Sequence, residues 1–181
     1  MKFKFNIRLT DKDYLDFNKF WMLKTPYGKK QLSLTRKILY LIFAIGILIL
    51  LFMGEITAQT YITIVGSIVL CLLFQALMAR FFILSLKIQI KTMKKSGKMP
   101  FSEESNMEFY DETFIEYTTE NKNEHKYSAI DRVSVVGGQV IYIHLNNVMA
   151  YMLPFDSFES VEEYNRFFDF IKTKVNTVDI Y

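Results

Sequence analysis

Two stretches without Asp, Glu, Lys or Arg, residues 38–53 and 61–79, limit most strongly what this chain can fold into. A helix needs about 20 mainly apolar residues to cross the hydrocarbon core of a bilayer. The second stretch is that long, and the first becomes so when it is extended to 34–54. Backbone polar groups in lipid must bond within their own segment. We therefore predict an antiparallel transmembrane hairpin with spans at about 34–54 and 61–84.

The charges divide sharply along the chain. Residues 1–37 carry ten basic and three acidic groups, residues 80–100 carry six basic groups and no acidic one, and residues 101–181 carry six basic and fifteen acidic groups. Cytoplasmic flanks of membrane helices collect Lys and Arg, so we predict that both termini are cytoplasmic, at a bacterial inner membrane. The flanking cations either set only the topology or also bind anionic membrane lipid; they are Arg36, Lys37, Arg80, Lys87, Lys91, Lys94 and Lys95.

The chain reads as three parts: 1–31, 32–100 and 101–181. In the first, residues 2–9 alternate polar and apolar, which predicts a half-buried strand, and Thr10 with Asp13 predicts the start of a helix over 11–23. That helix either lies on the bilayer or packs on the soluble domain. Residues 25–28 (TPYG) are expected to break it, and the helix after the second span is expected to continue as a basic segment over 87–98.

The third part reads as short strands followed by one helix. Gly137-Gly138 predicts a tight hairpin turn, and Ser160 with Glu163 predicts the capped start of an amphipathic helix. The expected strands are 106–110, 113–119, 124–128, 130–136, 139–145 and 148–153, with a turn at 121–123. With strand 2–9 this makes an α+β domain: an antiparallel sheet or barrel of about seven strands capped by a C-terminal helix, the layout of a pleckstrin-homology-like barrel.

Short motifs along the chain resemble the YcxB-like family of bacterial two-span membrane proteins. They are TDKDY (10–14), MEFYDE (107–112), YSAI (127–130) and MLP (152–154) followed by Phe158. Tyr127 and Ala129 stand where that family often has Trp and Asp. The resemblance implies the architecture and a membrane location, and it brings no reaction with it.

No catalytic, metal or cofactor constellation is visible in the sequence. His125 and His144 are far apart, and Cys71 is the only cysteine. The acidic run from Glu103 to Glu124 reads as a solvated sheet face, or as a surface that docks against the basic segment 87–98. The acidic third part makes nucleic acid an unfavourable partner, because phosphate contacts need clustered cations. The sequence indicates no small-molecule substrate.

The favoured hypothesis is a non-enzymatic membrane protein whose cytoplasmic domain binds a protein or peptide partner. The candidate contact is the hairpin that carries Gln139, Tyr142, His144 and Tyr151. Polar groups within the second span are expected to pack helices, including those of a homo-oligomer: Ser67, Cys71 and Gln75. The alternatives are an oligomeric subunit of a small transporter or channel, and a membrane enzyme acting on lipid.

Overall fold

The structure, a computed structural model, describes residues 1–53, 57–97 and 99–181. It divides into two compact units. The sandwich unit is Met1–Phe17 with Gly97–Tyr181, and the membrane unit is Asn18–Ser96. Each unit is described by itself.

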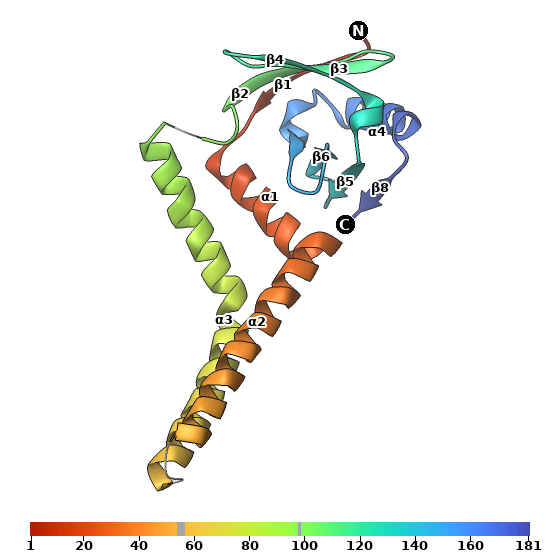
Figure 1. Cartoon of the computed structure of the whole chain (residues 1–181). Helices are drawn as coiled ribbons and strands as arrows, with labels where there is room; N and C mark the ends of the chain where they lie inside the picture. Colours follow the sequence, from red (N-terminus) through yellow and green to blue (C-terminus); the bar gives the residue numbers. More distant parts are fainter. Residues whose placement is uncertain (54–56, 98) are drawn as a thin grey trace. The chain divides into compact units, whose positions relative to one another are not determined.

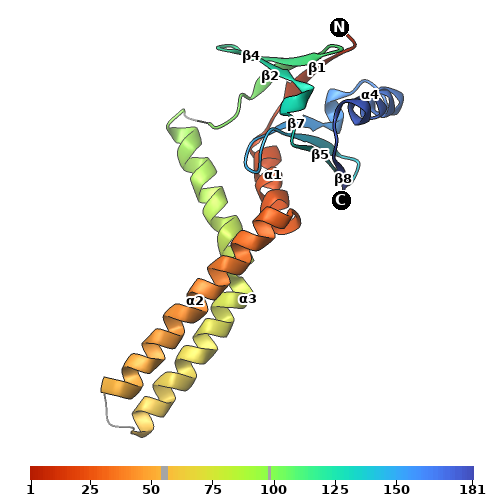
Figure 2. The ribbon, with the colours of Figure 1, turned by 45° about the vertical axis from the view of Figure 1, so that its right-hand side comes forward.

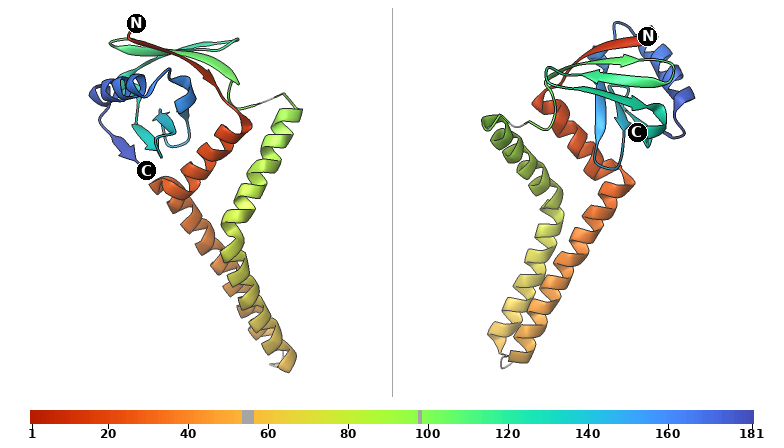
Figure 3. Two further views of the ribbon diagram at one scale, coloured as in Figure 1. Left: turned by 180° about the vertical axis from the view of Figure 1, so that it is seen from behind. Right: turned by 45° about the horizontal axis from the view of Figure 1, so that its top comes forward.

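The sandwich unit contains two four-stranded sheets (Figure 1). The first is antiparallel, in the order β1 (Phe3–Arg8), β2 (Glu104–Phe109), β3 (Thr113–Tyr117) and β4 (Lys122–Lys126). Its strands lie side by side, the N-terminal strand in red and the others in green (Figure 3). The predicted N-terminal strand therefore does join a sheet formed by residues from the other end of the chain.

The second sheet has the order β7 (Ala150–Pro154), β6 (Val140–His144), β5 (Arg132–Val136) and β8 (Val178–Ile180). Strands β5 to β7 are antiparallel, while β8 lies parallel to β5. The predicted hairpin turn is confirmed: Gly137 and Gly138 have φ of +55° and +66°, a region that glycine enters without steric cost. The α+β class predicted from the sequence is confirmed.

Aromatic side chains from both ends of the chain fill the core of the sandwich. Helix α4 (Val161–Lys174) places Phe167 at its centre, fully buried. The Phe167 ring lies edge-on to Phe5 at 4.9 Å and to Phe109 at 4.8 Å between centroids, a favoured aromatic geometry. The helix begins as predicted, because the Ser160 hydroxyl accepts a 3.1 Å hydrogen bond from the Glu163 amide.

The membrane unit is a helical hairpin (Figure 2). Helix α2 (Pro26–Met53) has 28 residues and α3 (Ala58–Lys95) has 38. At 1.5 Å per residue both exceed the roughly 30 Å of a bilayer's hydrocarbon core. Both are long and apolar enough to cross a membrane, and the predicted continuation of the second helix through the basic segment is present as far as Lys95.

A tight elbow joins α1 (Asp11–Lys24) to α2. The predicted break over 25–28 is too wide, because only Thr25 interrupts the helices. Its hydroxyl donates to the Trp21 carbonyl at 2.6 Å and accepts from the Gly28 amide at 3.1 Å, so it caps α2, and Pro26 takes the first helical position, where no amide is needed. A Cβ on Gly28 would lie 2.0 Å from the Trp21 carbonyl oxygen, so the elbow requires glycine.

Three other boundaries differ from the sequence prediction. The turn placed at 121–123 is wrong, since β4 already begins at Lys122 and the turn is closed by the Thr118 amide on the Asn121 carbonyl at 2.9 Å. Residues Tyr127–Ala129 form a 3-10 helix, η1, rather than the end of a strand. Strand β8 was not predicted. The predicted loop residues 54–56 and Lys98 of the basic segment lie outside the described residues.

Candidate functional site: a polar cleft at the open end of the sandwich

Strand β3 turns a carboxylate towards the inside of the sandwich. Side chains two residues apart on a strand share a face. Phe114 is fully buried in the core, so Glu116 on the same strand faces inward as well. The register places Met107 of β2 and Asn123 of β4 directly beside Glu116. The inner face of the first sheet is therefore apolar around Phe114 and becomes polar at Glu116 and Asn123.

Hydrogen bonds link the polar groups of this region across the two sheets. The Asn123 side-chain amide donates to the Glu116 carboxylate at 3.1 Å. From the opposite sheet, the Tyr151 hydroxyl of β7 lies 2.8 Å from Nε2 of His125. Burial, together with the charge of Glu116 and a hydrogen bond to it, raises the pKa of Tyr151 to about 12. The Tyr151 hydroxyl thus keeps its proton at neutral pH and donates it in a hydrogen bond within this group of side chains.

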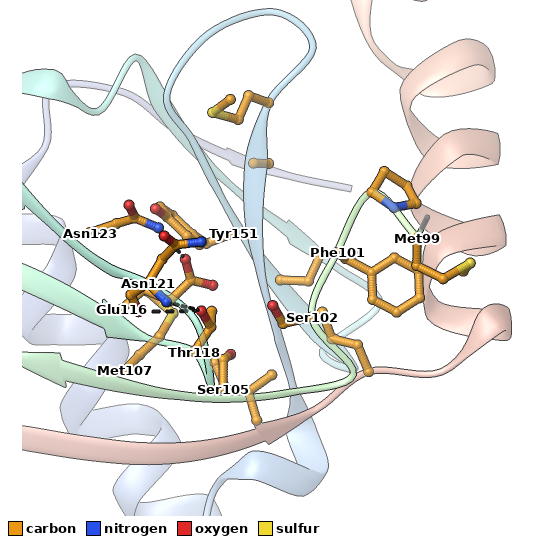
Figure 4. A pocket seen from close by; sticks show the side chains of 16 residues that line it. Met99, Phe101, Ser102, Ser105, Met107, Glu116, Thr118, Asn121, Asn123 and Tyr151 are labelled. Carbon is orange, nitrogen blue, oxygen red and sulfur yellow. Dashed lines mark hydrogen bonds between the residues drawn. The ribbon is translucent and has the colours of Figure 1, made fainter. Parts of the chain in front are cut away.

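Glu116, Asn123 and Tyr151 line a cleft of about 360 Å³ (Figure 4). One wall is the end of β1 and the segment that leads into β2, the other is the turn between β3 and β4, and β7 runs along the cleft. The lining includes Ile7, Leu9, Met99, Pro100, Phe101, Ser102, Ser105, Met107, Glu116, Thr118, Asn121, Asn123, Met149, Ala150, Tyr151 and Met152. Binding sites are usually concave and hold a few polar groups at fixed positions, and this cleft brings polar groups from both sheets together.

Residues 109–171, from the end of β2 to near the end of α4, match the family model described as YcxB-like protein. The chain contains a YcxB-like domain. With the two candidate membrane helices, this supports the two-span description that the sequence motifs indicated. The comparisons with curated proteins and with solved structures gave no match. The polar residues of the cleft region that lie within the YcxB-like domain include Glu116, Asn123, His125 and Tyr151.

The cleft lies beside two strand edges of the sandwich. Strand β4 ends the first sheet and β7 ends the second, and neither has a further strand beside it among the described residues. An edge strand presents unpaired backbone donors and acceptors. The sandwich unit therefore offers both a hollow and hydrogen-bonding backbone at one place.

The predicted partner-binding hairpin is only partly at the surface. Gln139 is exposed and Tyr151 is half-buried in the cleft, but Tyr142 and His144 are buried. The prediction that these two side chains face a partner is wrong because the start of α1 covers them, with the Phe17 ring 5.1 Å from that of Tyr142. Phe17, the last residue of the sandwich unit's N-terminal segment, thus packs on the second sheet.

Burial controls the ionisation of both covered side chains. It raises the pKa of Tyr142 well above its usual range, with Asp16 adding to the effect. It lowers the pKa of His144 to about 4, aided by the nearby Arg132 cation and opposed by Asp131. The ring of His144 is neutral at pH 7, and its Nε2 lies 3.1 Å from the Ser134 hydroxyl.

The predicted packing residues of the second span lie on α3. Cys71 is buried, and the Gln75 side-chain amide donates to the Arg36 carbonyl of α2 at 3.5 Å, a long contact. The Ser67 hydroxyl donates to the Thr63 carbonyl of its own helix at 2.8 Å. The seven predicted flanking cations, on α2 and α3, are all exposed: Arg36, Lys37, Arg80, Lys87, Lys91, Lys94 and Lys95.

Sequence reasoning missed the cleft because it took Glu116 as one of a run of solvated carboxylates. The alternation of Phe114 and Glu116 on one strand was the available signal. In the described part of the chain no group of three or more His, Cys, Asp or Glu could hold a metal ion, and no Lys or Arg forms an ion pair with Glu116.

Proposed function

We propose that this protein is a membrane-anchored, non-enzymatic binding module whose YcxB-like domain holds a protein or peptide partner in the cleft beside β7. The observation that carries the proposal is the inward carboxylate of Glu116 in a hollow that borders an open strand edge. A carboxylate turned towards a sandwich interior loses hydration. A partner that supplies a donor there would restore the lost interaction.

The membrane unit would serve as the anchor. Its two long apolar helices and the exposed cations that flank them suit a hairpin whose basic ends lie at anionic headgroups. We place the protein in the bacterial inner membrane with both termini in the cytoplasm, since the lysine and arginine residues gather on that side of the hairpin. The two sheets with one C-terminal helix further suggest a pleckstrin-homology-like barrel. This similarity concerns the arrangement of the elements and does not identify a ligand.

The polar groups of the second span favour anchoring over the alternative of a transporter or channel subunit. The hydroxyls of Thr63 and Ser67 donate to carbonyls of their own helix, at 2.9 and 2.8 Å. Such groups are satisfied locally and need no water-filled path. We assign the polar residues of the second span a role in packing helices, either within the hairpin or between copies of the protein in a homo-oligomer.

Recovery of a partner from native membranes tests the proposal. The full-length protein is purified by affinity in mild detergent as wild type, Met149→Asp and Val148→Asp. Both positions are exposed, by 56% and 65%, on the same loop, but only Met149 lines the cleft.

We expect a stoichiometric partner with the wild type and with Val148→Asp, and its loss with Met149→Asp. A partner retained by both variants, or the absence of any stoichiometric partner, would refute binding at the cleft.

A further inference from the structure

We propose that the cleft recognises a basic side chain, Lys or Arg, on an extended segment of the partner that pairs with the free edge of β7. This inference rests on the proposed function and adds the chemistry of the bound segment. It comes from three properties of the sandwich unit: the charge in the cleft, the direction of the free backbone groups of β7, and the direction in which an added strand would send its side chains.

The cleft contains a negatively charged hydrogen-bond acceptor, the carboxylate of Glu116, and among the described residues no Lys or Arg forms an ion pair with it. Glu116 accepts a hydrogen bond from the Asn123 side-chain amide and interacts with the Tyr151 hydroxyl. Residues 101–181 carry six basic and fifteen acidic groups, so the surrounding field also favours a cation. An acidic anchor would be repelled, and a purely apolar one would leave the negative charge of the carboxylate without a counter-charge.

The ladder between β6 and β7 shows which backbone groups of β7 are free. The Leu145 amide donates to the Met149 carbonyl at 3.0 Å, and the Phe155 amide donates to the Gln139 carbonyl at 2.7 Å. In an antiparallel ladder the bonded pairs alternate. Tyr151 and Leu153 therefore also bond to β6, while Ala150 and Met152 turn their amide and carbonyl groups outward. These are the groups that an added strand would use.

An added strand would send a side chain to the carboxylate. Leu153 is fully buried in the core, and Tyr151 packs edge-on against Phe114 with 5.6 Å between centroids, so both face the interior. Neighbouring strands lie about 4.8 Å apart, and residues directly opposite one another share a face. The partner residue opposite Tyr151 therefore points into the cavity that Glu116 and Asn123 line.

A long basic side chain suits this cavity. Lys and Arg bury an apolar stem and place a charged head at its end. Met107, directly opposite Glu116 on the inner face of the first sheet, lines the cavity and would contact the stem, while Glu116, Asn123 and the Tyr151 hydroxyl supply polar atoms for the head.

The test uses the full-length protein in nanodiscs and a displayed library of random linear 12-residue peptides without cysteine. Enriched peptides are synthesised with a fluorescent label, and their affinity is measured by anisotropy against wild type, Glu116→Gln and Glu120→Gln. Glu120 is an exposed carboxylate in the turn between β3 and β4 and does not line the cleft, so it is the matched control.

We expect one basic position shared by the enriched peptides. Glu116→Gln should weaken their binding about 10- to 100-fold, the range expected for a hydrogen bond between charged groups. Glu120→Gln should change it less than about twofold, since exposed charges interact weakly. Replacing the basic residue of the peptide by Met should weaken binding to the wild type and change binding to Glu116→Gln little further.

Enriched peptides with an acidic or apolar anchor, or with equal affinity for wild type and Glu116→Gln, would overturn the basic anchor while leaving the cleft as a binding site. A library that yields no binder would overturn it as well. The proposed function is judged separately, by partner recovery with Met149→Asp.

Discussion

Protonation of His144 should destabilise the sandwich unit as the pH falls. The ring is fully buried, lies 3.1 Å from the Ser134 hydroxyl and has the Phe17 ring at 6.4 Å. A cationic ring there would lose its hydration and meet the Arg132 cation, with only Asp131 opposing that effect. The folded state therefore holds the neutral ring.

The size of the effect follows from the two pKa values. Folding lowers the pKa of His144 from 6.5 to about 4, and one pKa unit corresponds to about 1.4 kcal/mol. The unfolded chain binds the proton near pH 6.5 and the folded chain only near pH 4. This contribution to stability is present above pH 6.5, falls between 6.5 and 4, and totals about 3 kcal/mol.

The assay is urea unfolding of the full-length protein in detergent, followed by near-ultraviolet circular dichroism of the tyrosines, for wild type and His144→Gln. The variant should be less stable at pH 7.5, because Gln fills the site poorly. Its deficit should shrink by about 3 kcal/mol at pH 4. Carboxylates titrate in both proteins, so their effects cancel in the difference. A deficit that stays constant from pH 7.5 to 4 would refute the burial of a neutral ring.

Three further substitutions probe the elbow, the core and the helix cap. Gly28→Ala should lower the thermal midpoint of the membrane unit, because its Cβ would lie 2.0 Å from the Trp21 carbonyl oxygen, whereas Gly46→Ala, with nothing within 4 Å, should not; equal midpoints would contradict the elbow geometry. Phe167→Ala should cost about 3–5 kcal/mol in urea unfolding, since it empties the centre of the core; a loss below about 1 kcal/mol would place this ring outside the core. Ser160→Ala should cost about 1 kcal/mol in the same assay through the lost cap, and no loss would show that the cap adds no stability.

The fold follows from the sequence wherever a long or strictly periodic pattern exists. The alternation of residues 2–9 predicts β1, the Gly137-Gly138 turn predicts the β5–β6 hairpin, and the stripe that includes Phe167 predicts α4. Strand β8 could not be found in this way. It has three residues, too few to show a period, and it is held by parallel pairing to β5.

The cleft and the covered face of β6 depend on contacts between distant segments. Glu116 could have been assigned an inward direction from Phe114 two residues earlier, but the opposing Tyr151 comes from the other sheet. Tyr142 and His144 alternate along β6 with the core residues Ile141 and Ile143, the pattern of a strand with one buried and one exposed face. Nothing in that alternation indicates that Phe17, more than a hundred residues earlier, covers them.

Site-specific photo-cross-linking in native membranes tests binding at the cleft most directly. A photoreactive phenylalanine analogue replaces Met149, which lines the cleft, or Asp169, whose side chain is 78% exposed on α4 and lies outside it. We expect one discrete cross-linked protein from position 149, lost when the same chain also carries Glu116→Gln, and none from position 169. No cross-link from position 149, or the same products from both positions, would contradict the cleft as the site at which this protein holds its partner.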